Sequence, residues 1–393
     1  MRPVAIIGAG TTKFGRSQWS LLKLMAEAAH AAMDDAGLET RAVDAVYVAN
    51  MGAARLNRQS GLASALVDRL NLYPAAADTV ENGPASGASA VKNGFLAVAS
   101  GLYDLVLVVG AERMRVVNGM DATDFVAFLT HPRAEYIYGT TLPSLAGMFT
   151  RMYMDKYGVT SDHLAMVAEK NHANAMLNPN AHIHQPISID AILHRPEAVV
   201  NNPFVAEPLR LYDCCPVSDG ACAVLLCAAD RAAEFKKAMV TIAGIGQATD
   251  THAVHERPDP TELRAVRIAA EKAFAMAALG PADMDVVELH DAFTILEIAE
   301  SEHAGFFPVG EGHKALERGD TRIGGRLPIN PCGGLKAKGH PVGATGVAQI
   351  VELVYQLRGE ADKRQVSGAR RGFACNFGGF GNNVVCTVLE RGE

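Results

Sequence analysis

Cysteine is missing from the first half of the chain, and this absence limits where thiol chemistry can occur. The 393 residues contain seven cysteines, which are Cys214, Cys215, Cys222, Cys227, Cys332, Cys375 and Cys386. No pair of Cys-x-x-Cys motifs is present, so the sequence predicts no metal site of the structural zinc type. An odd number of cysteines in a large chain is typical of free thiols. Any nucleophilic thiol must therefore come from the second half.

The sequence also has no excess of basic residues and no long apolar run. Its formal net charge of −7 argues against a nucleic acid or an anionic membrane surface as a partner. No uncharged apolar run reaches the roughly 18 residues of a membrane span. The first stretch, MRPVAIIGAGTTKFG, has no long apolar signal-peptide core and predicts a strand and a turn. We therefore expect a cytoplasmic protein with no membrane partner.

Short β-rich runs alternate with longer amphipathic segments along the whole chain, as in VAIIGAG followed by SLLKLMAEAAHAAMDDAG. This alternation favours an α/β fold whose buried sheets are covered by helices. A strand, a turn and a helix rich in glycine and alanine occur in each half, which predicts two similar α/β halves. We place the N-terminal half at residues 1–114 and 206–237 and the C-terminal half at 238–393. Residues 115–205 break the rhythm and predict a loop domain that covers one face.

The stretch NPCGGLKAKGHPVGATG, residues 330–346, is the strongest chemical signal. Its glycines bring the backbone close to whatever binds, and His340 lies at a rigid Gly-His-Pro corner. A histidine titrates near neutral pH, so His340 is a candidate general base. A structural histidine in a glycine-rich turn is the alternative.

Three further motifs carry candidate groups. In ELHDAFT, His290 could hold the oxygen of a carbonyl as it becomes an enolate, and Asp291 could orient a backbone segment or, as we favour, cap the next helix. In ACNFGGFGNN, Cys375 is either an acid/base group or a small buried residue. In YDCCPVSDGACA, we expect the adjacent thiols Cys214 and Cys215 to be structural.

Taken in order, these motifs resemble the thiolase superfamily, most closely its archaeal acetyl-CoA acetyltransferase-like and sterol-carrier-protein-linked branches. The resemblance rests on GGLKAKGHPVGATGVAQI and HDAF, with support from PVSDGACA, VGAER and GGFGNNVV. It implies the thiolase fold, with two α/β halves in a five-layered αβαβα arrangement and a covering loop domain. It also implies a homodimer or higher oligomer, a CoA thioester as substrate and no bound cofactor. Some members of these branches associate with a small protein that has a zinc ribbon and an oligonucleotide-type β-barrel.

The resemblance also implies roles for individual residues. His340 and His290 would lie in the reaction centre, with Cys375 in the final acid/base loop. Candidate residues for contacts with CoA are Lys336, Lys338, Gly339 and Gly379, of which the lysines would face the adenine phosphates.

The chain departs from the family at the nucleophile. Thiolases carry a cysteine before Ala-Ser-Gly, whereas here the sequence PASG places Pro84 at that position. Proline cannot form an acyl-enzyme, and it removes a backbone N–H; the loss of one oxyanion donor typically costs ~10²–10³ in rate. Proline suits the first turn of a helix, so we expect the fold to survive. Nothing in the sequence marks Ser86 as an activated nucleophile.

We therefore expect an enzyme that makes or breaks a carbon–carbon bond in an acyl-CoA thioester, with aldol or retro-aldol chemistry favoured. Thiolase-like aldolases of steroid side-chain breakdown carry tyrosines near the two histidine positions, whereas this sequence retains both histidines. One alternative is an acyltransferase with Cys332 or Cys375 as a relocated nucleophile. The other is a catalytically silent subunit that supports an active partner.

Overall fold

The structure is a computed structural model that describes residues 1–38, 43–194 and 202–392. Within these residues, nine strands form a mixed sheet in the order β3-β2-β4-β7-β1-β8-β11-β10-β9. The N-terminal half contributes β1 (Val4–Thr11), β2 (Ala45–Ala49), β3 (Ala76–Val80), β4 (Leu105–Arg113) and β7 (Asp219–Ala228). The C-terminal half contributes β8 (Val240–Thr249), β9 (Val286–Glu288), β10 (Arg371–Gly378) and β11 (Asn383–Arg391).

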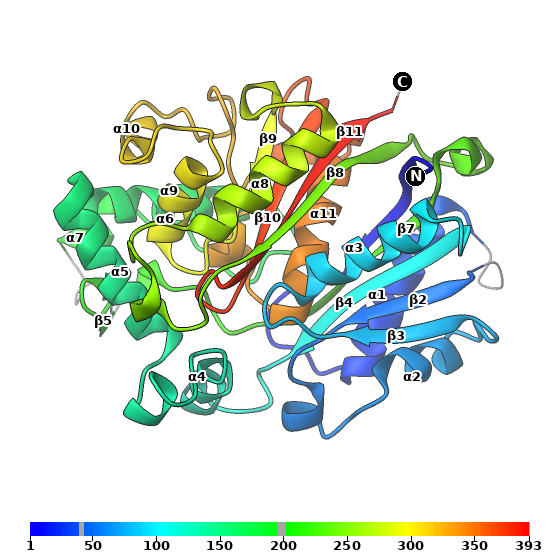
Figure 1. Cartoon of the computed structure of the whole chain (residues 1–393), viewed down its shortest axis with the longest axis horizontal. Coiled ribbons are helices and arrows are strands. Elements are labelled where there is room, and N and C mark those ends of the chain that lie inside the picture. Colours follow the sequence, from blue (N-terminus) through cyan, green and yellow to red (C-terminus); the bar gives the residue numbers. More distant parts are fainter. Residues whose placement is uncertain (39–42, 195–201, 393) are drawn as a thin grey trace.

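The two half-sheets join through a short contact and enclose two helices between them. Strands β1 and β8 pair at Ala5–Thr241 and Ile6–Val240. Figure 1 shows α3 (Ser86–Ala99) and α11 (Val342–Arg358) in the middle of the molecule. The helices approach so closely that a Cβ on Gly87 would lie 2.7 Å from the backbone nitrogen of Gly346, so only glycine fits there. The small residues of both helices thus permit the central layer.

Outer helices complete the layers. Helices α1 (Leu21–Ala36) and α2 (Leu62–Arg69) pack on the N-terminal half-sheet, and α8 (Arg264–Ala277) and α9 (Thr294–His303) on the C-terminal one. A separate central core holds side chains from both half-sheets and from α3 and α11. This arrangement confirms the predicted five-layered α/β fold.

The segment between β4 and β7, residues 114–218, is called the inserted segment below, and it packs against the C-terminal half. It contains α4 (Gly119–Ala127), α5 (Leu142–Tyr157), α6 (Ser161–Ala175), α7 (Ile189–Leu193) and the hairpin of β5 (Phe204–Ala206) and β6 (Leu209–Arg210). Apolar side chains of α5 and α6 share one core with those of α9. The predicted loop-domain boundaries stay a prediction, because part of the span, residues 195–201, lies outside the described residues. The short helix α10 (Gly312–Glu317) belongs to the C-terminal half.

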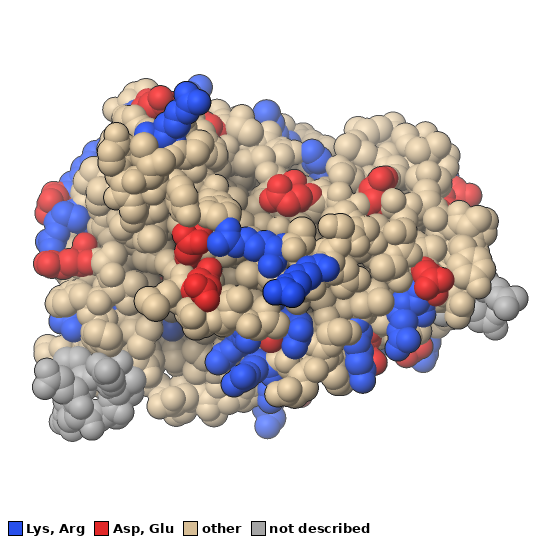
Figure 2. All heavy atoms as spheres, turned by 90° about the horizontal axis from the view of Figure 1, so that it is seen from below, with Lys and Arg blue, Asp and Glu red and all other residues tan. Residues whose placement is uncertain are grey.

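Figure 2 shows the face that carries α2 and α4, where basic side chains gather across the centre although the chain as a whole is acidic. Over the described ranges, no helix has both the length and the apolarity needed to cross a bilayer.

Candidate active site

The first turns of the two central helices and the loop after β9 meet at one small cavity of about 120 Å³. Pro84 stands just before α3, and His340 stands two residues before α11. Both residues line the cavity. The other lining residues are Met114, Ala122, Thr123, Val126, Leu142, Pro143, Cys214, Cys215, Pro216, Val217, Ala292, Phe293 and Val342. The residue at the expected nucleophile position and the predicted base therefore line the same cavity.

The hydrogen bonds of His340 define its tautomer. Its Nδ1 lies 2.7 Å from Oγ1 of Thr345, and that hydroxyl lies 3.1 Å from the carbonyl oxygen of Pro341. A carbonyl only accepts, so the Thr345 hydroxyl donates to Pro341 and accepts from Nδ1–H of His340. The imidazole therefore keeps an unprotonated Nε2. Burial lowers the pKa of His340 to about 3, so the ring is neutral at physiological pH.

His290 has the opposite tautomer. Asn376 accepts a hydrogen bond from the backbone N–H of Ala88 through Oδ1, at 3.2 Å, so its Nδ2 points to Nδ1 of His290, at 3.1 Å. The amide nitrogen donates, so Nδ1 of His290 accepts and its Nε2 carries the proton. Burial and the neighbouring His340 lower the pKa of His290 well below its usual value. His290 is therefore a neutral N–H donor.

The two rings lie next to each other. Their centroids are 4.9 Å apart and their planes are nearly perpendicular, at 89°. His290 and His340 are only 2% and 8% exposed. One buried site thus contains a nitrogen lone pair for taking a proton and an N–H for stabilising a developing oxyanion.

Asp291 holds the loop that carries His340. Its Oδ1 accepts the backbone N–H of Leu335 at 2.6 Å, and its Oδ2 accepts the side-chain N–H of Asn171 at 2.7 Å. A Cβ on Gly334 would lie 2.2 Å from Oδ2, so the close approach requires glycine. The favoured helix-capping role of Asp291 is thus wrong: Phe293 is at the N-cap of α9, and Asp291 orients backbone instead.

Comparison with known proteins places this geometry in a family. The family model for the thiolase N-terminal domain matches residues 4–230, and the thiolase C-terminal domain-like model matches residues 246–391. The chain belongs to the thiolase family. It is 45% identical to an acetyl-CoA acetyltransferase of Methanothermobacter thermautotrophicus over 100% of both chains. It is 34% identical to sterol carrier protein 2 of Gallus gallus, over 100% of this chain and 72% of that protein.

A solved thiolase-like structure is also similar. It is that of the Ltp2-ChsH2(DUF35) aldolase, and it matches with a TM-score of 0.84 and 25% identity over 99% of this chain and 98% of that chain. The proteins similar to this chain thus include some named for acyl transfer and one named for aldol chemistry.

Ser86, close to Pro84 in the same turn, does not replace the missing nucleophile. The Ser86 hydroxyl is fully buried, donates to the carbonyl of Gly83 at 2.6 Å and accepts the backbone N–H of Asn82 at 2.8 Å. It is used within the turn. As the sequence indicates, Ser86 is not poised for attack.

Cys332 and Cys375, the thiols predicted as relocated nucleophiles, do not line the cavity. His290 does not line it either, but its ring contacts that of His340, which does. The Cys375 side chain lies against Cys386 and Glu300, and these interactions with burial raise its pKa well above the usual range. The Cys332 thiol donates to Oε2 of Glu288 at 2.8 Å, and burial raises its pKa well above the usual range. The structure therefore corrects both assignments as nucleophiles.

Asn376, which the sequence analysis missed, occupies the place expected for Cys375. Successive strand residues point to opposite faces, so in β10 Asn376 faces His290 while Cys375 faces the outer core. Asparagine after the cysteine in ACNFGG was a signal that could have been used. Cys375, which was predicted to act in the acid/base loop, thus has no contact with either histidine among the described residues.

The predicted CoA lysines are buried. Lys336 and Lys338 are 2% and 5% exposed; Nζ of Lys336 lies 3.3 Å from Nε2 of His172, and Nζ of Lys338 lies 3.8 Å from Oε2 of Glu288. Neither ammonium group is placed to bind adenine phosphates at the surface, which corrects that interpretation. Gly339 has φ +110° and packs on Ser218, and Gly379 has φ +56° beside Asn382, so both shape turns.

Cys214 and Cys215, expected to be structural, are the thiols that line the cavity. The backbone N–H of Cys215 donates to the carbonyl of Ala292 at 2.9 Å, which attaches this segment to the HDAF loop. Burial, opposed in part by the nearby Lys336, raises the pKa of Cys215 to about 12. The thiol is therefore protonated at neutral pH.

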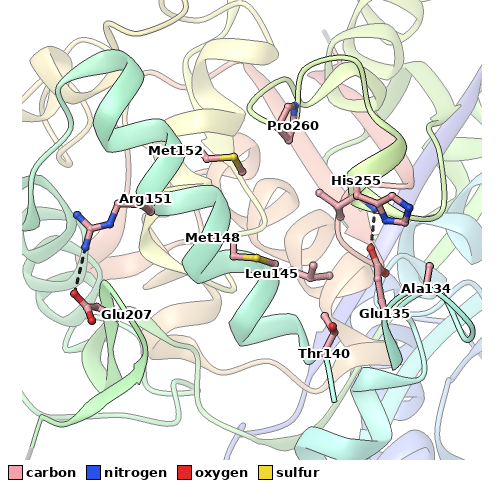
Figure 3. Close-up of a pocket in the computed structure, with 11 residues that line it drawn as sticks. Ala134, Glu135, Thr140, Leu145, Met148, Arg151, Met152, Glu207, His255 and Pro260 are labelled. Atoms are coloured by element: carbon pink, nitrogen blue, oxygen red, sulfur yellow. Dashed lines mark hydrogen bonds and ion pairs between the residues drawn. The ribbon is translucent and has the colours of Figure 1, made fainter. Parts of the chain in front are cut away.

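Helix α5 also lines a second, larger cavity of about 870 Å³. Leu142 and Pro143 of this helix line the small cavity, and Leu145 lines the large one together with residues one and two turns further on. Figure 3 shows Met148 and Met152 on its wall, with the Arg151–Glu207 ion pair at one side. Its size suits a long, flexible ligand.

Proposed function

We propose that this thiolase-family protein makes or breaks the carbon–carbon bond of a β-hydroxyacyl-CoA thioester by aldol chemistry. The observation that carries the proposal is the cavity lined by both Pro84 and His340, with the His290 ring in contact with that of His340. Aldol cleavage requires a base and an oxyanion donor, and it requires no acyl-enzyme. The two histidine tautomers supply the base and the donor.

In the cleavage direction, Nε2 of His340 takes the proton of the β-hydroxyl group. The bond between Cα and Cβ breaks, the hydroxyl carbon becomes a carbonyl, and the electron pair moves into the thioester as an enolate. Nε2–H of His290 stabilises the enolate oxygen. Imidazolium at His340 returns the same proton to Cα, so the products are an aldehyde or ketone and a shortened acyl-CoA. The negative enolate favours the protonated form of His340 during the step, despite its low pKa in the empty site.

The large cavity is the proposed route for the CoA portion. Helix α5 contributes residues to both cavities, and the volume of the large one, about 870 Å³, lies within the range of ligand pockets. The basic side chains at the centre of the face in Figure 2 would attract the phosphates of CoA to the protein.

We also propose a small partner protein, because the name of the similar Ltp2-ChsH2(DUF35) aldolase joins two components. The inserted segment exposes large apolar side chains that a partner could cover, with exposed fractions of 81% for Met120, 64% for Ile137 and 78% for Tyr138. Co-expression with a small zinc-ribbon protein followed by size-exclusion chromatography tests this association.

A homodimer is proposed through the sheet edge. Strand β3 is the terminal strand of the sheet and pairs with β2 alone, and an unpaired edge invites a second strand. Light scattering of the purified chain tests the proposal; a monomer at micromolar concentration would contradict it.

The decisive assay follows cleavage of β-hydroxyacyl-CoA thioesters of several chain lengths, with separate detection of the carbonyl product and the acyl-CoA. We expect equal amounts of both products from the native chain and none from His340→Ala. Ser64→Ala, a change at an exposed side chain of α2, is the control. No cleavage, with or without a partner, would favour the silent subunit instead.

A second candidate is acyl transfer through a thiol of the cavity, because Cys214 and Cys215 line it beside Pro84 and His340. Intact-protein mass spectrometry after incubation with acetyl-CoA, with mapping of any adduct, separates the two functions. A stoichiometric acyl group on Cys214 or Cys215 would establish transfer. An unmodified protein that cleaves β-hydroxyacyl-CoA would establish aldol chemistry.

A further inference from the structure

A third cavity, of about 360 Å³, borders the small reaction cavity on the side of Pro216 and Val217. Both residues line the two cavities. Arg16, Arg115 and Asn118 line the third cavity but not the reaction cavity, and we call the third one the arginine cavity. Arg16 also lines an open cavity of about 680 Å³ on its other side.

The arginine cavity lies very near the reacting groups. Val217 forms a parallel β-bridge with His340. Met114 lines the reaction cavity, and Arg115, the next residue, lines the arginine cavity. A ligand group in the arginine cavity is therefore separated from the base by little more than one side chain.

The two guanidinium groups have free charge. Among the described residues, no carboxylate lies within 4.0 Å of either one. Nη1 of Arg115 lies 3.1 Å from Nε2 of His182. Nδ1 of His182 lies 2.9 Å from Oγ of Ser218, which donates to the carbonyl of Pro216, so His182 donates through Nδ1 and accepts from Arg115. A neutral histidine thus orients Arg115, and no described carboxylate is in direct contact with its guanidinium group.

Asp219 holds both arginine-bearing segments in place. One carboxylate oxygen accepts the backbone N–H of Arg115 at 2.7 Å, and the other accepts the backbone N–H of Ser17 at 3.0 Å. Its side chain is almost fully buried. The carboxylate of Asp121 accepts a hydrogen bond from the side-chain amide of Asn118 at 2.9 Å.

We propose that the arginine cavity binds a carboxylate at the far end of the acyl chain, so that the substrate is the CoA thioester of a dicarboxylic acid. This inference rests on the proposed function and narrows its substrate class. Guanidinium groups recognise carboxylates in bidentate geometry. The phosphates of CoA are a poor match, because the whole pantetheine arm separates the diphosphate from the thioester sulfur while this cavity borders the reaction cavity.

The experiment measures binding by calorimetry, with two unreactive thioethers of CoA as probes. One carries a 4-carboxybutyl group and the other a pentyl group of similar length. The variants are Arg115→Gln and Arg16→Gln, with Arg264→Gln on the outer helix α8 as a control of equal charge change. Arg115→Lys tests whether a charge without the guanidinium fork suffices, and circular dichroism checks that each variant is folded.

We expect the native chain to bind the carboxylated probe about tenfold to a hundredfold more tightly than the pentyl probe. Arg115→Gln should remove that preference without weakening the pentyl probe, and Arg264→Gln should leave it unchanged. Equal binding of both probes to the native chain would overturn the inference alone. An equal loss of both probes in Arg115→Gln would assign the arginines to the CoA phosphates and overturn it as well. Failure of the native chain to bind either probe would contradict the proposed function itself.

Discussion

The tautomer of His340 can be tested by a single substitution, because it depends on the hydroxyl group of Thr345. Thr345→Val keeps the shape of the side chain but removes the oxygen that accepts from Nδ1–H of His340. Both residues are buried, so the N–H loses its partner without access to water. An unsatisfied buried donor costs about 1–3 kcal/mol. This cost favours the other tautomer, in which the proton lies on Nε2 and the lone pair no longer faces the cavity.

The magnitude follows from that cost. Since about 1.4 kcal/mol corresponds to a factor of ten, the tautomer ratio should shift by roughly 5- to 150-fold. We expect kcat for β-hydroxyacyl-CoA cleavage to fall by about tenfold to a hundredfold, with KM little changed. Thr345→Ser keeps a hydroxyl and should restore most of the rate.

Nitrogen NMR of labelled histidine gives a readout independent of substrate. The Nε2 signal of His340 should have the shift of an unprotonated nitrogen in the native chain and move toward that of a protonated one in Thr345→Val. Native activity in Thr345→Val, together with an unchanged Nε2 signal, would refute the assignment of His340 as a base oriented by Thr345.

Three other predictions concern buried groups. Pro84→Cys should accept an acyl group from acetyl-CoA, seen as a mapped adduct by mass spectrometry, whereas Pro84→Ala should not; an unmodified Cys variant would argue that the site cannot stabilise acyl transfer. The pKa of His340 is about 3 in the free enzyme, so kcat/KM should not fall with decreasing pH between pH 8 and 5 through protonation of this residue. A fall in kcat/KM with a midpoint near pH 6.5 that is absent from Thr345→Val would contradict this. Burial raises the pKa of Glu112 from 4.5 to about 7. Between pH 4.5 and 7 the folded chain therefore binds a proton that the unfolded chain does not, and the free energy of unfolding falls by about 3 kcal/mol as the pH rises through 7. Glu112→Gln should remove that part of the pH dependence of urea unfolding, and an unchanged slope would count against it.

Much of the fold follows from local sequence patterns. Alternation of apolar runs and amphipathic segments predicts strands and covering helices, and small residues before and within α3 and α11 predict their close packing. The resemblance carried by the motifs around His290 and His340 implies that both histidines lie in one reaction centre, and the structure brings their rings together. The same resemblance predicts from PASG that Pro84 stands where the family carries its nucleophile.

The structure was needed wherever a function depends on which way a side chain points. Cys375 and Asn376 are neighbours in β10, and the pairing of that strand between β9 and β11 turns the amide, not the thiol, toward His290. The two lysines beside the glycine loop resemble surface groups in sequence, but the loop packs under the inserted segment and buries them.

Periodicity was sufficient to predict the α/β fold class, and the family resemblance carried by short motifs implied the pair of histidines and the proline at the nucleophile position. Three features required the folded chain: the tautomers of His290 and His340, the presence of Cys214 and Cys215 in the cavity, and the meeting of Arg16 with Arg115. These depend on hydrogen bonds and contacts between segments that lie far apart along the chain, which no local pattern encodes.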